Sequence, residues 1–167
     1  MTRELAQVET PIGGFRAVVE DGAVRTAGFV DHKGVRRDSS GVHLVLAAYF
    51  AGEIDALDAL TVAPQGTAFK QAVWKLLREV HAGSTVSYGE LAARVGAPGA
   101  ARAVGTANAT NPICLIIPCH RVIRTGGGLG GYGFGLARKR WLLAHEAPAF
   151  EMVSAQVSSG APSVRRR

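Results

Sequence analysis

The segment 111–122, with the sequence NPICLIIPCHRV, constrains the fold more than any other part of this chain. Its apolar part predicts a short buried strand at 113–117, and Pro118 ends that strand because proline lacks a backbone donor. Cys119 follows at once, beside an imidazole and a guanidinium. A thiol is a good nucleophile as the thiolate, and neighbouring cations or a hydrogen-bonded base favour that form. The segment therefore predicts a reactive cysteine at position 119.

A base for that cysteine is close at hand in the sequence. Side chains of adjacent residues diverge in strands and helices, so Cys119 and His120 are expected to communicate through a water molecule. The imidazole then needs an orienting carboxylate, and Glu146 is the acid of the C-terminal half most expected to be buried. The alternative is a cysteine and a histidine that only pack in the core, and Cys114 fits that alternative better.

The composition is typical of a soluble globular protein, with 167 residues, 47% hydrophobic and 19% charged. No apolar run approaches ~18 residues, so no membrane span is expected, and the N-terminus lacks a signal-peptide core, which predicts a cytoplasmic location. Two cysteines five positions apart match neither a disulfide framework nor a zinc motif, so both are expected to be free thiols. His32 and His43 have no clustered partners that would make a metal site.

The charges are distributed unevenly along the chain. The net charge is +6, yet residues 1–65 carry more acids than bases, whereas residues 66–147 carry ten Lys and Arg against three Glu. A positive half beside a negative one indicates a polyanion, such as nucleic acid, as the partner of the positive half. Chance variation of solubilising charge is the alternative.

Residues 1–65 are expected to form a small α+β lobe. The pattern predicts strands at 15–20 and 23–30, joined by a tight Asp21-Gly22 turn, and a helix at 42–50. A linker rich in Pro and Gly closes the lobe at 63–66. Nothing in this lobe indicates a reaction.

Residues 66–147 are expected to form a mainly helical unit that binds DNA. The pattern predicts a helix at 69–80 capped by Thr67, and a helix-turn-helix in which a capping box precedes small residues at 100–108. That second helix offers few side chains to base edges, so it would hold DNA with little sequence preference, although many helix pairs never bind DNA. A glycine-rich loop at 124–133 and a helix at 136–146 complete the unit, and we expect a disordered basic tail at 148–167.

Ordered motifs across residues 66–147 resemble one family, the O6-alkylguanine-DNA alkyltransferases (methylated-DNA–protein-cysteine methyltransferases). The matching pieces are Val86-Ser87-Tyr88, Ala100 to Gly105, Asn111-Pro112, Ile117 to Val122, Gly131-Tyr132, and Lys139 through Trp141 to Glu146. The resemblance implies a ribonuclease H-like N-terminal lobe and a winged-helix-like C-terminal lobe. It further implies a monomer that repairs double-stranded DNA without a cofactor or a metal ion. The alkyl group of O6-alkylguanine, and of O4-alkylthymine, would pass irreversibly to Cys119.

The same resemblance implies a role for individual residues. His120 and Glu146 would activate Cys119 through water, and Asn111 would be the hinge before the reactive segment. Tyr88 would help to rotate the damaged nucleotide outward and Arg102 would fill the gap. The resemblance also assigns DNA contacts to Ala101 and Asn108, and a guanine pocket to Val122, Tyr132, Gly133, Phe134 and Lys139.

One departure from the family pattern affects the pocket. Phe134 stands where many relatives have glycine, and its bulk would narrow or cap the pocket. The sequence therefore does not decide whether the pocket accepts large O6 adducts. Three other functions are weighed against repair. A non-catalytic alkyltransferase-like protein would lack the cysteine, a helix-turn-helix regulator would need base-reading side chains, and a cysteine hydrolase would need an oxyanion hole and turnover.

Overall fold

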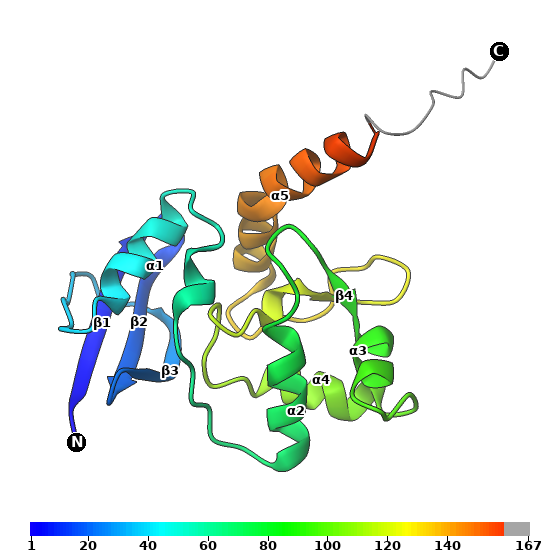
Figure 1. Cartoon of the computed structure of the whole chain (residues 1–167), viewed down its shortest axis with the longest axis horizontal. Coiled ribbons are helices and arrows are strands. Elements are labelled where there is room, and N and C mark those ends of the chain that lie inside the picture. The colour runs from blue at the N-terminus through cyan, green and yellow to red at the C-terminus, as the bar shows by residue number, and fades with distance from the viewer. Residues whose placement is uncertain (159–167) are drawn as a thin grey trace.

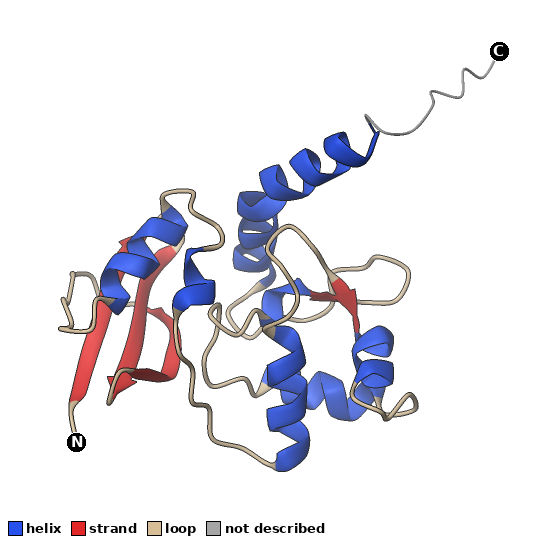
Figure 2. Ribbon diagram, in the orientation of Figure 1, coloured by secondary structure: helices blue, strands red, loops and turns tan. Residues whose placement is uncertain are grey.

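The computed structural model describes residues 1–158, with side-chain contacts up to residue 147. A three-stranded sheet covered by a helix forms the N-terminal part, and helices joined by long loops form the C-terminal part (Figure 1). The linker between them runs from the 3₁₀ turn η1 (Ala56–Ala59) to α2 (Ala68–Leu77), as the loops of Figure 2 show. This is the mixed α and β architecture that the sequence predicts.

The N-terminal sheet is an antiparallel meander in the order β1 (Arg3–Thr10), β2 (Gly13–Glu20), β3 (Ala23–Val30), and α1 (Val42–Phe50) packs on it. The predicted hairpin is confirmed. Asp21 and Gly22 both have positive φ, which is the backbone conformation that a tight two-residue turn needs in order to match the twist of its strands.

Strand β1 was not predicted. Its buried and exposed residues do not alternate regularly, because Ala6, Gln7 and Val8 are all buried. The Gln7 amide donates to the carbonyls of His32 and Gly34, both at 3.0 Å, so a polar side chain is satisfied inside.

Local capping fixes the start of two C-terminal helices as predicted. The Thr67 hydroxyl accepts a hydrogen bond from the Lys70 amide at the start of α2. Ser87 and Glu90 form the reciprocal capping box of α3 (Tyr88–Arg94), and α4 (Ala101–Ala109) follows after the turn. Trp74 of α2 donates its indole N–H to the Ala107 carbonyl at 2.8 Å, which fixes α2 against α4.

The predicted strand at 113–117 is wrong. Only Ile113 forms a bridge to β3, where the Cys114 amide donates to the Ala27 carbonyl at 3.0 Å. The chain then turns back at Leu115, whose φ is +72°, and the Ile117 amide donates to the Ile113 carbonyl at 3.0 Å. The run is apolar because it is buried from both sides, and a short apolar run does not reveal its own conformation.

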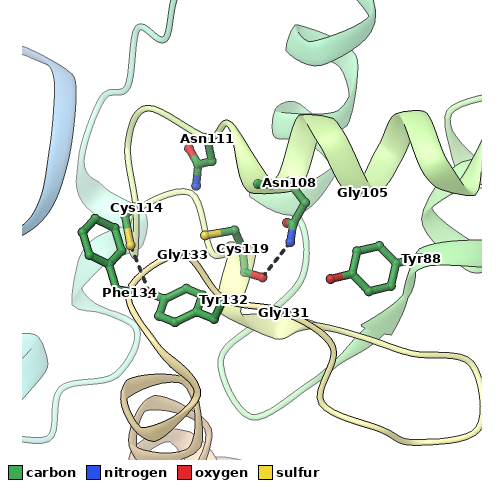
Figure 3. A pocket seen from close by; sticks show the side chains of 11 residues that line it. Tyr88, Gly105, Asn108, Asn111, Cys114, Cys119, Gly131, Tyr132, Gly133 and Phe134 are labelled. Atoms are coloured by element: carbon green, nitrogen blue, oxygen red, sulfur yellow. Dashed lines mark hydrogen bonds between the residues drawn. The ribbon is translucent and has the colours of Figure 1, made fainter.

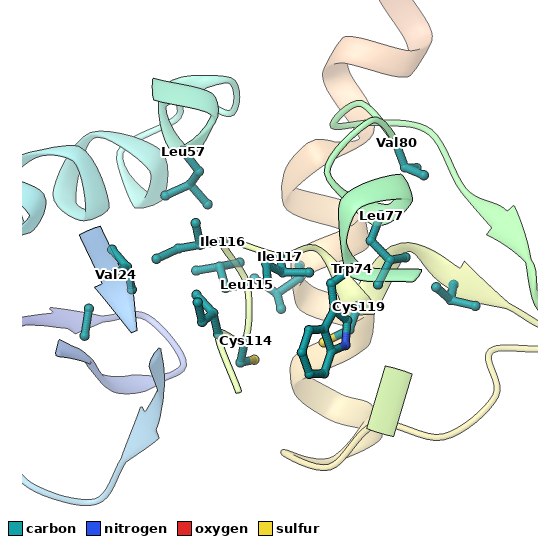
Figure 4. Packing of buried hydrophobic residues seen from close by; sticks show 14 of the residues in the cluster. Val24, Leu57, Trp74, Leu77, Val80, Cys114, Leu115, Ile116, Ile117 and Cys119 are labelled. Carbon is teal, nitrogen blue, oxygen red and sulfur yellow. The ribbon is translucent and has the colours of Figure 1, made fainter. Parts of the chain in front are cut away.

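This buried turn lies at the centre of the hydrophobic core and joins the two parts. Figure 4 shows Ile116 facing Val24 and Leu57 of the N-terminal part, while Ile117 lies toward Trp74 of α2. Pro118 leads into a 3₁₀ turn, η2 (Cys119–Arg121), and then β5 (Val122–Ile123), which pairs in parallel with β4 (Val86–Ser87). The segment 113–122, called the reactive segment below, is thus fixed from both ends.

The last helix, α5, spans Leu136–Ser158. It starts where predicted and continues past residue 146, the predicted end of the helix. The expectation of a disordered tail stays a prediction. The rest of the predicted tail, 159–167, lies outside the described residues. Within the described part of the chain, no helix combines the length and apolar character that spanning a bilayer requires.

Candidate functional site

A cavity of about 250 Å³ opens beside the buried turn (Figure 3). Its walls come from α3, α4, the reactive segment and the glycine-rich loop, and they contain most of the residues to which the sequence assigned a role. The lining residues are Tyr88, Gly105, Asn108, Ala109, Asn111, Cys114, Cys119, Gly131, Tyr132, Gly133 and Phe134.

Cys119 lies at the first position of η2, and it is 6% exposed. Its backbone is held on both sides. The backbone amide of Cys119 donates to the Ile117 carbonyl at 2.8 Å, and the side-chain amide of Asn108 donates to the Cys119 carbonyl at 3.3 Å. The neighbouring Cys114 thiol, with help from Asn111 and against the effect of burial, lowers the pKa of Cys119. This environment favours the thiolate form of Cys119.

Asn111 folds the chain into the reactive segment. Its side-chain N–H donates to the Ile117 carbonyl at 2.8 Å, and its oxygen accepts from the Ile113 amide at 3.0 Å. The two bonds tie the end of α4 to the buried turn. These bonds lie at the point where the sequence analysis expects a hinge residue.

His120 and Glu146 are in contact, as the sequence predicted. The His120 Nε2 lies 2.8 Å from Glu146 Oε1, and both side chains are buried. Burial lowers the pKa of His120 even against the attraction of Glu146, which favours the neutral ring. A carboxylate only accepts, so Nε2 carries the proton and Nδ1 is left as an acceptor. Nδ1 is buried and has no partner among the described residues.

Two further residues hold Glu146, and the sequence did not reveal either role. Arg121 donates twice to this carboxylate, both at 2.9 Å, and Tyr49 of α1 donates its hydroxyl at 2.7 Å. Burial alone would raise the pKa of Glu146, but His120 and Arg121 hold it well below its usual range. The position of Arg121 directly after Cys119-His120 was a usable signal, whereas Tyr49 lies 97 positions away from its partner.

The predicted DNA-contacting residues lie on α3 and α4. Ala101 and Arg102 are exposed on the first turn of α4. Tyr88 lies between Gly105 and Gly130, and a Cβ at Gly130 would meet its hydroxyl at 3.1 Å. Burial raises the pKa of Tyr88, so its hydroxyl keeps its proton at neutral pH.

The predicted guanine pocket divides into two groups. Tyr132, Gly133 and Phe134 line the cavity, whereas Val122 and Lys139 do not. The buried Lys139 ammonium donates to the backbone carbonyls of Val122 at 2.7 Å and of Leu129 and Gly131 in the glycine-rich loop. Lys139 therefore shapes the pocket by bracing that loop.

Phe134 connects the cavity to the N-terminal sheet. Its ring packs edge to face on Phe29, with centroids 5.4 Å apart, and a Cβ at Gly28 would meet its tip at 2.9 Å. The N-terminal part thus holds one wall of the cavity. No group of three or more His, Cys, Asp or Glu residues in the described part of the chain is arranged to hold a metal ion.

Comparisons with known proteins agree on one family. Residues 68–148 match the family described as "6-O-methylguanine DNA methyltransferase, DNA binding domain". A methylated-DNA–protein-cysteine methyltransferase of Salmonella typhimurium is 50% identical over 119 residues, which cover 69% of this chain and 70% of that protein. The crystal structure of the Mycobacterium tuberculosis O6-methylguanine methyltransferase is 40% identical, with a TM-score of 0.75 over 88% of this chain and 94% of that one. A structure of the M. tuberculosis protein in complex with DNA is similar at 39% identity and a TM-score of 0.75, over 86% of this chain and 93% of that one.

Proposed function

The chain belongs to the methylated-DNA–protein-cysteine methyltransferase family, and from this premise we propose which of its residues carry out the repair. The protein repairs DNA by transferring the alkyl group of O6-alkylguanine to a cysteine of its own. We assign Cys119 as that cysteine. The observation that carries the assignment is its position on the cavity wall, next to a buried imidazole–carboxylate pair.

The transfer needs a thiolate and a route for its proton. Nδ1 of neutral His120 is free to accept that proton through one water molecule, and the resulting imidazolium is stabilised by Glu146. The Cys119 sulfur then attacks the alkyl carbon in line, the S–C bond forms and the C–O6 bond breaks. Guanine leaves with its electron pair and needs a proton, for which the protonated Tyr88 hydroxyl at the cavity is the candidate donor.

The damaged base must leave the duplex to reach Cys119, because O6 is hidden inside the stack. The exposed α4, with small residues along one side, fits close approach of a phosphate backbone. Arg102 on its first turn is placed to occupy the gap. The base then enters the cavity between Tyr88, Tyr132 and Phe134.

Counting transferred groups tests this function. The protein is mixed with excess duplex that carries radiolabelled O6-methylguanine, and label bound to protein is measured over time. One equivalent per molecule, followed by no further transfer, is the expected result, since a thioether has no easy route to hydrolysis. Continued product release would support the cysteine hydrolase, and binding without transfer would support the non-catalytic protein. The non-catalytic protein is not favoured, because relatives that are 50–55% identical to this chain are named as methyltransferases.

Several finer assignments belong to the same proposal. We propose that O4-alkylthymine is a second substrate, and that the protein acts as a monomer in the cytoplasm. We also propose the division into residues 1–65, 66–147 and a tail. The meander with α1 supports a ribonuclease H-like N-terminal lobe, and the helix pair with the β4–β5 pairing supports a winged-helix-like C-terminal lobe.

A further inference from the structure

A second thiol shares the wall of the reactive cavity. Cys114 is 2% exposed and, as expected, contributes to the core, but its sulfur also lines the cavity with Cys119. Figure 3 shows the Cys119 sulfur directed toward Cys114, whereas the Cys114 sulfur is directed toward the Tyr132 hydroxyl. Five extended residues would span ~17 Å, and the turn at Leu115 removes this separation by reversing the chain.

The Cys114 sulfur has a polar environment that packing does not require. It forms a hydrogen bond of 3.0 Å with the Tyr132 hydroxyl. Backbone bonds to β3 fix Cys114 itself, since its amide donates to the Ala27 carbonyl. A buried cysteine that only packs behaves as a small apolar group. This one is held in a fixed position beside a more reactive thiol.

We propose that Cys114 is the resolving thiol for oxidation of Cys119, so that hydrogen peroxide converts the pair into a reversible intramolecular disulfide. In the first step the Cys119 thiolate attacks one peroxide oxygen, the O–O bond breaks, and water leaves after protonation, which gives a sulfenic acid. In the second step the Cys114 sulfur attacks the Cys119 sulfur, the S–O bond breaks and a second water leaves. Two thiols are oxidised and one peroxide is reduced.

The disulfide would protect Cys119, which accepts an alkyl group only once. A sulfenic acid without a neighbouring thiol is oxidised further to sulfinic and sulfonic acids, which ordinary thiols do not reduce. With Cys114 beside it, the acceptor is stored as a disulfide that thiol–disulfide exchange reopens. The inference stands on the thiol pair and goes beyond the repair function, since the oxidation needs no DNA.

Mass spectrometry after treatment with hydrogen peroxide tests the proposal. The wild-type protein is expected to lose ~2 Da, with a 114–119 cross-link in the peptide map and no dimer on a non-reducing gel. Two matched variants, Cys114→Ala and Cys114→Ser, should instead gain ~32 or ~48 Da at Cys119. The serine variant keeps a hydroxyl for Tyr132, so agreement between the two excludes a packing defect as the cause.

Methyl transfer gives a second readout, with each protein compared with its own untreated sample. After peroxide and then a dithiol reductant, the wild type should regain most of its transfer, whereas both variants should stay at least about fivefold below their starting level. Irreversible oxidation of the wild type, an intermolecular disulfide, or no reaction with peroxide would each overturn the proposal. Absence of transfer in the untreated wild type would count against the repair assignment instead, and the mass readout would still decide the disulfide.

Discussion

Replacing Glu146 with glutamine should destabilise the protein strongly. The carboxylate is fully buried and accepts hydrogen bonds from His120, Tyr49 and, twice, Arg121. Glu146→Gln removes the negative charge and leaves the buried Arg121 guanidinium without its counter-ion. Breaking a buried pair in this way costs about 3–5 kcal/mol. This is a large part of a typical stability of about 5–15 kcal/mol.

Urea and thermal unfolding at pH 7 measure the effect. For a domain of this size, a loss of 1 kcal/mol in unfolding free energy lowers the thermal midpoint by ~2–4 °C, so the thermal midpoint of Glu146→Gln should fall by about 6–20 °C. The matched control is Glu53→Gln, an exposed carboxylate in the N-terminal part, which should stay within about 0.5 kcal/mol of the wild type. If Glu146→Gln lowered the free energy of unfolding by less than about 1 kcal/mol, the buried carboxylate would not be a main source of stability at this site.

The same variant tests the relay at a temperature where it remains folded. Loss of the anion beside His120 should slow methyl transfer by about 10²–10⁴-fold, since the imidazolium that forms would have no stabilising partner. An unchanged rate in a folded Glu146→Gln protein would show that the imidazole works without the carboxylate.

Three further predictions concern acid stability, the acceptor and the DNA contact. The folded-state pKa of Glu146 is depressed, so its contribution to stability is present above its unfolded pKa of about 4.3 and is lost as the pH falls below that value. The free energy of unfolding should therefore fall less steeply with acid in Glu146→Gln than in the wild type, and equal slopes would contradict the assignment. Cys119→Ser should reduce methyl transfer by at least about 10³-fold and leave duplex affinity within about threefold; retained transfer in a label-counting assay would move the acceptor elsewhere. Arg102→Ala should slow repair of duplex about 10- to 100-fold while reaction with free O6-benzylguanine changes little, because only the duplex requires base flipping. Arg3→Ala, which removes an exposed arginine of β1, is the control, and equal losses on both substrates would argue against a gap-filling role.

Local signals predicted the local structure well. The Thr67 cap, the Ser87–Glu90 capping box and the Asp21-Gly22 turn each depend on residues a few positions apart, and the structure confirms all three. The helices that they bound were therefore predictable. The start of α5 was also predicted, but its end was not.

Features set by tertiary contacts could not be predicted. The apolar run at 113–117 resembles a strand, yet it turns at Leu115 because both parts of the molecule bury it. Strand β1 hides a buried Gln7 that only the distant loop at His32 and Gly34 satisfies.

The candidate site shows the same division. The sequence predicted that His120 and Glu146 meet, because residues 66–147 hold only three acids and Glu146 was the one expected to be buried. It did not predict the role of Tyr49, which comes from α1 on the other side of the core. Nor did it place Lys139 under the glycine-rich loop, since the three carbonyl partners of its ammonium are backbone groups that carry no sequence signal.

Intact mass spectrometry tests the central claim most directly. The protein is mixed with one equivalent of duplex that contains a single O6-methylguanine, and both the whole mass and the proteolytic peptides are measured. The account predicts a stoichiometric gain of ~14 Da that maps to Cys119 alone. An unchanged mass, or a methyl group on Cys114 or any other residue, would contradict it.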